Sequence, residues 1–222
     1  MNPVEIIDVA ELPGGGLLHL LQCGPDFSIQ FGEEELMGNQ AFDSEEALAT
    51  LACRRIGARP GRVLIGGLGM GFTLGAALSA LPETATIVVA ELVPAVVAWA
   101  KGPLAHIFGA KLTDPRVTVA VRDVHDVIVD SVGAFDGILL DVDNGPDGLI
   151  HLANDRLYCN WGLNAAYAAL RPGGVLAVWS SYPDEDFVVR LEKAGFVVEE
   201  IVLAANCGRA RTPYTIWLAC KP

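Results

Sequence analysis

From Arg62 to Ser181 the chain alternates short apolar segments with segments of helical periodicity, and this alternation constrains the fold more than any other feature. The apolar segments are RVLIGG, ATIVVAEL, VTVAVRD, FDGILLDVD and GGVLAVWSS. Strands joined by helices run parallel, because a parallel return needs a crossover connection. The pattern therefore predicts an α/β, Rossmann-like fold with a mostly parallel sheet and helices on both faces.

Both ends of the chain depart from this alternation. Near the C-terminus, FVVEEIVLAA and TPYTIWLAC read as two strands with no helix between them. Their connection is too short for a parallel crossover, so the last strand must be antiparallel. Residues 1–40 read as short strands around the turn-rich PGGG and predict a small N-terminal β-hairpin region. The next segment, DSEEALATLACRRIG, predicts a helix with Asp43 as its N-cap and Glu46 completing a capping box.

The charge of the chain excludes some partners. The 222 residues carry a formal net charge of -12. A protein that binds nucleic acid needs a basic face for the phosphates, so we predict no nucleic-acid partner. The acidic field suits a small-molecule acceptor that is neutral or cationic. Self-association as a homodimer is compatible with these features.

Composition also predicts the cellular location of the protein. No run of about 18 uncharged apolar residues is present, which predicts no membrane span. The first residues include Glu5, Asp8 and Glu11 and no basic residue, unlike a signal peptide. Five scattered cysteines and four histidines without metal-ligand spacing predict a reducing compartment and no metal site. We therefore predict a cytoplasmic protein without a membrane partner.

The strongest local signal is the glycine-rich segment VLIGGLGMGF, between a predicted strand and a predicted helix. A GxxxxGK[ST] phosphate loop is excluded, because no lysine follows the glycines. A dinucleotide-binding GxGxxG is excluded because Phe72 stands at the third glycine position. Gly67, Gly69 and Gly71 instead match GxGxG, the pattern of S-adenosylmethionine-dependent transferases. A glycine turn that serves only close packing is the alternative.

Acidic side chains end three successive predicted strands behind this loop. These residues are Glu91, Asp123 and Asp141. Ligands of open α/β sheets bind at the carboxyl ends of the strands, where these side chains gather. We expect Glu91 to accept hydrogen bonds from ribose hydroxyls, with a helix cap as the alternative, and Asp123 to lie within reach of an adenine amino group. Together with the glycine loop, the acids predict a nucleoside site.

These residues resemble the class I S-adenosylmethionine-dependent methyltransferase fold, and within it the spermidine synthase-like group. The resemblance rests on GGLGMGFTL, AEL, RD, FDGILLDVDNGP and LRPGGVLAVWS. It implies a seven-stranded sheet with the last strand inserted antiparallel. It also implies a domain over residues 41–222 that binds S-adenosylmethionine or its decarboxylated form. The residues it assigns to that cofactor are Gly67, Gly69, Gly71, Glu91, Asp123 and Asp141.

The active-site loop departs from the pattern of this family, which reads D-x-x-D-P. Asp141 matches the first acid, Asn144 stands at the second, and Asp143 lies one place away. Met70 stands where the family's glycine loop carries an aspartate that helps hold an amine. An asparagine cannot act as a base, and a methionine cannot anchor an ammonium. The candidate catalytic residues are Asp141, Asp143 and Asn144.

These departures favour methyl transfer. The sulfonium already activates the methyl group, so the protein mainly aligns the reactants and excludes water. A diamine must instead lose a proton before it attacks carbon. We therefore predict a methyltransferase acting on a small molecule, with Trp179 and Tyr182 either lining the acceptor site or packing helix against sheet. The alternatives are a polyamine aminopropyltransferase of the spermidine synthase type, using decarboxylated S-adenosylmethionine, and a non-catalytic nucleoside-binding homologue.

Overall fold

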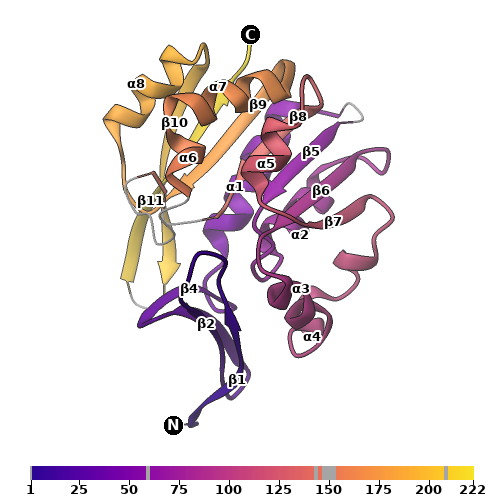
Figure 1. Ribbon diagram of the computed structural model, residues 1–222, viewed down its shortest axis with the longest axis vertical. Helices are drawn as coiled ribbons and strands as arrows, with labels where there is room; N and C mark the ends of the chain where they lie inside the picture. The colour runs from indigo at the N-terminus through magenta and orange to yellow at the C-terminus, as the bar shows by residue number, and fades with distance from the viewer. Residues whose placement is uncertain (1, 59–60, 143–144, 147–153, 208–209) are drawn as a thin grey trace.

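The chain forms two sheets in a computed structural model (Figure 1). The structure describes residues 2–58, 61–142, 145–146, 154–207 and 210–222, with the backbone alone at 205–207 and 210–212. The smaller sheet is antiparallel and has the order β1-β2-β3-β4. The larger sheet has seven strands in the order β10-β11-β9-β8-β5-β6-β7.

The N-terminal strands form one small antiparallel sheet, as the prediction of a β-region at this end of the chain implies. Its strands are β1 (Val4–Glu11), β2 (Leu17–Cys23), β3 (Asp26–Phe31) and β4 (Glu34–Gly38). Alternate side chains of β2 and β3 point into the core, namely Leu18, Leu20, Phe27 and Ile29. Because these residues share one cluster with the helices of the larger domain, the small sheet packs directly against that domain.

The seven-stranded sheet confirms the predicted α/β fold. Its strands are β5 (Arg62–Gly66), β6 (Thr86–Glu91), β7 (Val117–Val121), β8 (Phe135–Leu140), β9 (Leu170–Ser180), β10 (Val197–Cys207) and β11 (Ala210–Cys220). The pairs among β5 to β9 are parallel. The last strand, β11, is antiparallel to both β10 and β9. The short β10–β11 connection dictates this reversal, as the sequence predicts.

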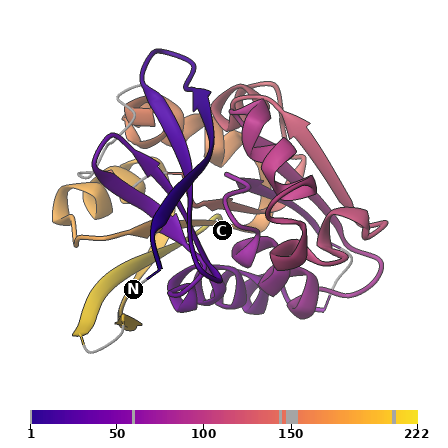
Figure 2. The ribbon, with the colours of Figure 1, turned by 90° about the horizontal axis from the view of Figure 1, so that it is seen from below.

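Helices cover both faces of this sheet, as Figure 2 shows. One face carries α1 (Asp43–Ile56), α2 (Phe72–Ala80) and α3 (Pro94–Lys101). The other carries α5 (Val124–Val129), α7 (Asn160–Ala169) and α8 (Glu185–Lys193). Shorter elements are α4 (Ala105–Phe108), α6 (Asp155–Tyr158) and the 3-10 turn Lys111–Thr113. Within the described ranges, no helix has the length and apolar character needed to cross a bilayer.

Helix α1 begins differently from the prediction. Phe42 is the N-cap, and no side chain makes a capping hydrogen bond, so the predicted capping box of Asp43 and Glu46 is wrong. The Phe42 ring instead stacks on Phe72 at the start of α2, with ring centroids 4.3 Å apart. Asp43 and Glu45 consequently belong to the first helical turn.

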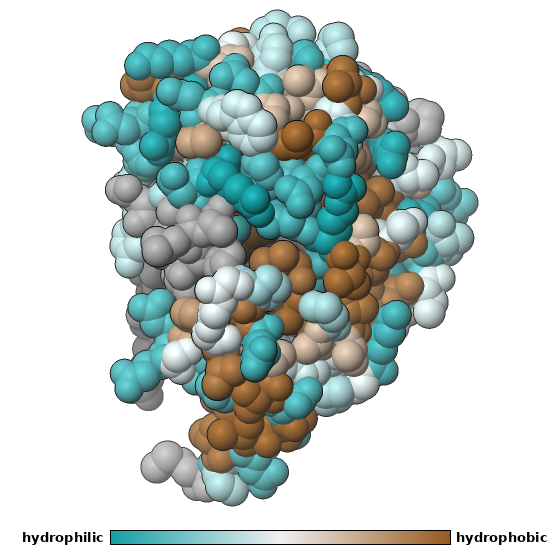
Figure 3. Space-filling model, in the orientation of Figure 1, coloured by the Kyte–Doolittle hydropathy of each residue, from teal (hydrophilic) through white to brown (hydrophobic). Residues whose placement is uncertain are grey.

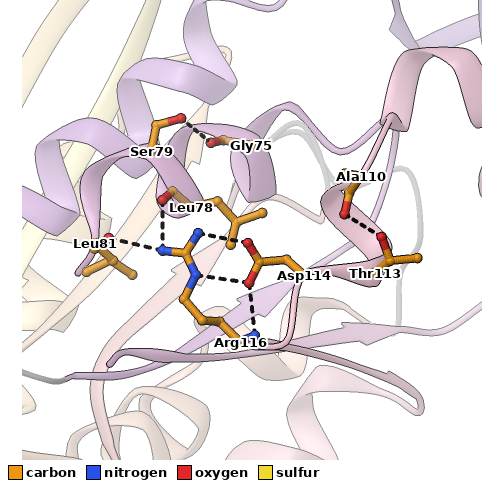
Figure 4. Close-up of polar contacts among 8 residues, drawn as sticks. All are labelled: Gly75, Leu78, Ser79, Leu81, Ala110, Thr113, Asp114 and Arg116. Carbon is orange, nitrogen blue, oxygen red and sulfur yellow. Dashed lines mark hydrogen bonds and ion pairs between the residues drawn. The ribbon is translucent and has the colours of Figure 1, made fainter. Parts of the chain in front are cut away.

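The end of α2 is fixed by an arginine from the sheet side (Figure 4). The Arg116 Nη1 atom donates hydrogen bonds to the carbonyls of Leu78 and Leu81, at 3.0 and 3.1 Å. Asp114 accepts hydrogen bonds from the same guanidinium, which lowers the pKa of Asp114 to about 2. Because carbonyls at a helix end otherwise lack partners, this arrangement secures the helix that begins at the glycine loop.

The N-terminal sheet lies beyond the carboxyl ends of the parallel strands (Figures 1 and 2). The Trp99 indole of α3 donates a hydrogen bond of 2.7 Å to Asp8 of β1. Figure 3 shows apolar residues gathered on this sheet at the lower end of the view. Its exposed apolar side chains are Val4, Ile6, Ile7, Val9 and Leu17. One part of the sheet is therefore exposed, while another part covers the strand ends where the candidate site lies.

Candidate active site

Two adjoining cavities lie at the carboxyl ends of the parallel strands. The first, which we call the strand-end cavity, has a volume of about 130 Å³ and is lined by Leu18, Phe31, Gly67, Glu91 and Asp123, among others. The second, which we call the acidic cavity, has a volume of about 340 Å³ and is lined by Glu35, Glu45, Met70, Asp141, Trp179 and Tyr214, among others. The cavities meet at Met37, Gly69 and Asp141, which line both.

The glycine loop forms part of both cavity walls. Gly67, Gly69 and Gly71 all have positive φ angles, of 88°, 49° and 76°. A Cβ atom on Gly71 would lie 2.5 Å from the Phe108 ring, and one on Gly69 would lie 2.8 Å from the Met37 sulfur. The backbone conformation therefore favours glycine at all three positions, and the Phe108 ring leaves no room for a side chain at Gly71. The glycines therefore serve close packing, and whether the loop also binds a ligand stays a prediction.

Glu91 ends β6 and is buried, with 7% of its surface exposed. One carboxylate oxygen accepts a hydrogen bond from the Leu68 amide and the other from the Val93 amide, both at 2.8 Å. Burial raises the pKa of Glu91, and these amides oppose the shift. Since Val93 is the N-cap of α3, the carboxylate both braces the glycine loop and supports the helix start. Glu91 also faces the strand-end cavity, where the ribose contact is predicted.

Asp123 follows β7 and is the N-cap of α5. One oxygen accepts a hydrogen bond of 2.8 Å from the His125 amide, and the other pairs with Arg156. The side chain lines the strand-end cavity, and its contact with an adenine amino group stays a prediction. Arg156 carries no signal in the sequence, because α6 comes beside Asp123 only through the tertiary fold.

Asp141 follows β8 and faces both cavities. Its carboxylate accepts a hydrogen bond of 2.6 Å from the Thr73 hydroxyl at the start of α2. Burial raises the pKa of Asp141. The candidate catalytic residues Asp143 and Asn144 lie outside the described residues.

Glu45 is the acidic residue that the sequence analysis missed. It lines the acidic cavity from the first turn of α1. Burial, followed by the charge of Asp141, raises the pKa of Glu45 to about 7. A sequence signal was present, since Glu45 precedes the buried Leu48, Ala49 and Ala52 at the i+3, i+4 and i+7 spacing of one helical face. An acid on such an apolar face needs a partner or a function.

The acidic cavity presents carboxyl groups and aromatic rings. Its acids are Glu35, Glu45 and Asp141, and no lysine, arginine or histidine lines it in the described part of the chain. Burial, with the charges of Asp43 and Glu45, raises the pKa of Tyr214. This electrostatic field favours a cation and opposes an anion.

The remaining predicted acceptor-side residues are placed differently from one another. Trp179 lines the acidic cavity, and its buried indole nitrogen has no hydrogen-bond partner within the described ranges. Tyr182 is 60% exposed and is not part of the cavity wall. Met70 is buried in that wall, at the place where the family pattern carries an aspartate. Met70 of the glycine loop therefore offers this cavity only a thioether, whereas Glu45 of α1 offers it a carboxylate.

Comparison with known proteins finds similarity in structure alone. No protein-family model matches the chain, and no curated protein matches it. A spermidine synthase from Thermotoga maritima superposes with a TM-score of 0.77 and 17% identity, covering 98% of this chain and 73% of that one. This chain has a spermidine synthase-like fold. A spermidine synthase in complex with the transition-state analogue AdoDATO superposes with a TM-score of 0.75 and 15% identity, covering 98% and 72%.

These superpositions confirm the predicted fold resemblance. The spermidine synthase-like fold includes the seven-stranded, mostly parallel sheet with its antiparallel last strand and the small N-terminal sheet. At 17% and 15% identity, the likeness concerns the fold alone. The function must be argued from the two cavities.

Proposed function

We propose that the protein transfers an aminopropyl group from decarboxylated S-adenosylmethionine to a cationic amine. The observation that carries this proposal is the acidic cavity, in which Glu35, Glu45 and Asp141 face a common space. This function is the alternative in the sequence analysis rather than its preferred methyl transfer. The spermidine synthases that superpose on the chain support the same choice.

The strand-end cavity suits the nucleoside of the donor. The glycine loop, Glu91 and Asp123 border it, and apolar side chains from the N-terminal sheet close it. If the nucleoside of the donor binds there, the aminopropyl group on its sulfur would point toward Gly69 and Met37, where the two cavities meet. The aminopropyl group would then enter the acidic cavity.

The charge of this cavity discriminates between two forms of the donor. Beyond its sulfonium, S-adenosylmethionine carries an ammonium and a carboxylate, whereas the decarboxylated form carries the ammonium alone. A carboxylate beside Glu45 and Asp141 would meet like charge, and no basic side chain lines the cavity in the described ranges. Two like charges about 4 Å apart repel by about 4 kcal/mol at an effective dielectric constant of 20. The cavity therefore favours the decarboxylated donor.

The acceptor side fits an amine for the same reason. An ammonium group can pair with Glu45 or Asp141, and the Trp179 and Tyr214 rings offer faces for the alkyl chain and its charge. Asn144 and Met70 stand where the family pattern has acids, which spoke against a diamine acceptor. Glu45 supplies a carboxylate from α1 to the cavity that Met70 also lines, and this carboxylate supports an amine acceptor.

A product assay tests the proposal. The protein is incubated with putrescine, cadaverine or spermidine and with either donor, and the products are identified by mass spectrometry. We expect an aminopropyl adduct and methylthioadenosine from the decarboxylated donor. Methylated amine from S-adenosylmethionine, without any aminopropyl adduct, would restore the methyltransferase hypothesis. Tight donor binding without turnover of any amine would favour a non-catalytic homologue.

A further inference from the structure

We propose that Glu45 is the general base of this reaction and takes the proton from the attacking nitrogen of the acceptor. The inference rests on the proposed function and assigns a role that neither the glycine loop nor the active-site loop fills by its sequence pattern. It follows from the placement of two carboxyl groups on different walls of one cavity.

The two acids are held in different ways. Asp141 is fixed by the Thr73 hydroxyl and lines both cavities, so it lies where donor and acceptor meet. Glu45 lines the acidic cavity but not the strand-end cavity, and its carboxylate accepts a hydrogen bond from the adjacent Ser44 hydroxyl. Asp141 is therefore placed to hold positive charge near the donor, and Glu45 is placed beside the acceptor.

The proton affinity of Glu45 suits this role. A general base works best when its pKa lies near the working pH, and burial with the charge of Asp141 brings the pKa of Glu45 to about 7. The other titratable groups that face it are Asp43 on α1, Glu35 on β4 and Tyr214 on β11. Each of these is an acid, so none of them favours the ionised form of Glu45. The hydrogen bond that the Ser44 hydroxyl donates does favour the ionised form, but burial outweighs it.

The step balances in protons and electrons. The acceptor enters as an ammonium, and the Glu45 carboxylate takes one proton from it. The neutral nitrogen then attacks the propyl carbon bonded to the sulfonium, so that a carbon–nitrogen bond forms and the carbon–sulfur bond breaks. The bonding pair stays on sulfur, which leaves as the neutral thioether methylthioadenosine. The product nitrogen carries the positive charge, and Glu45 later releases its proton to water.

The test is a pH–rate profile of Glu45→Gln. Glutamine keeps the shape of a protonated glutamate, so this variant should fold, and a thermal melt verifies that it does. We expect kcat at pH 8 to fall by about 10²–10⁴-fold, the usual contribution of a positioned base. The acidic limb near pH 7 should disappear. The difference from the natural protein should narrow as the pH approaches the pKa of a free amine, about 10.

Glu46→Gln is the matched control, because Glu46 is an adjacent acid on α1 that does not line the acidic cavity. It should keep the natural rate and profile. If the natural protein transfers an aminopropyl group and Glu45→Gln matches it in rate and profile, the assignment of Glu45 is wrong while the proposed function stands. If the natural protein transfers no aminopropyl group to any amine, the proposed function fails, and the assignment fails with it.

Discussion

Removing the Glu91 carboxylate should affect stability and ligand binding together. In Glu91→Ala, the buried amides of Leu68 and Val93 lose the acceptor that each now contacts at 2.8 Å. An unsatisfied buried donor costs about 1–3 kcal/mol, so two cost about 2–6 kcal/mol. In a domain of this size, each kcal/mol lowers the melting temperature by about 2–4 °C. We therefore expect a loss on the order of 5–20 °C.

Calorimetric melting of the unliganded protein measures this loss. Glu192→Ala is the control, because Glu192 is an exposed acid on α8 and its removal should change stability by about 0.5 kcal/mol or less. The melting temperature of Glu91→Gln should lie between those of Glu91→Ala and Glu192→Ala, because the glutamine oxygen can accept a hydrogen bond from one of the two backbone amides but not from both. Donor binding to Glu91→Ala, measured below its melting temperature, should weaken by about a hundredfold or more. A natural melting temperature in Glu91→Ala would refute the bracing role, and natural affinity would refute the ribose contact.

Three further predictions concern the packing of the glycine loop, the pH dependence of stability and the binding of NAD. Gly71→Ala should lower the free energy of unfolding, measured in urea, by more than the roughly 1–3 kcal/mol of backbone strain alone, because the added Cβ also clashes with the Phe108 ring. Gly109→Ala has the same strain of a positive φ but no clash and should cost less, so equal costs would contradict the packing role of Gly71. Glu45 has a folded pKa of about 7, above its ordinary 4.5. Between these two pKa values the folded state binds more protons than the unfolded state, so the urea midpoint should fall as the pH rises. Glu45→Gln should make the urea midpoint less dependent on pH over that range, and an unchanged dependence would contradict the raised pKa of Glu45. NAD should not bind at micromolar concentration by calorimetry, because Phe72 occupies the third glycine position; saturable binding would contradict the assignment of the loop.

The architecture was predictable because it depends on local patterns and on short connections. Alternating strand and helix periodicity predicted the parallel sheet, and the short link between β10 and β11 predicted the reversed strand. The same patterns located Glu91, Asp123 and Asp141 correctly at strand ends, because a strand end is visible in the sequence.

The acidic cavity was not predictable in the same way. Glu45 and Asp141 come together only because α1 packs beside the carboxyl end of β8, and this contact depends on the whole fold. The capping-box pattern in the sequence involves Asp43 and Glu46, and it gives no sign that Glu45 faces the cavity. The bracing role of Glu91 was also hidden, because it depends on the direction of two backbone amides.

Selection between the two donors by the acidic cavity is the central claim, and titration calorimetry tests it most directly. The protein is titrated at pH 8 with decarboxylated S-adenosylmethionine and, separately, with S-adenosylmethionine. Allowing for screening of the like-charge repulsion, we expect the decarboxylated form to bind about 10–100-fold more tightly, and we expect Glu45→Gln to reduce that ratio. Equal or tighter binding of S-adenosylmethionine by the natural protein would contradict the account.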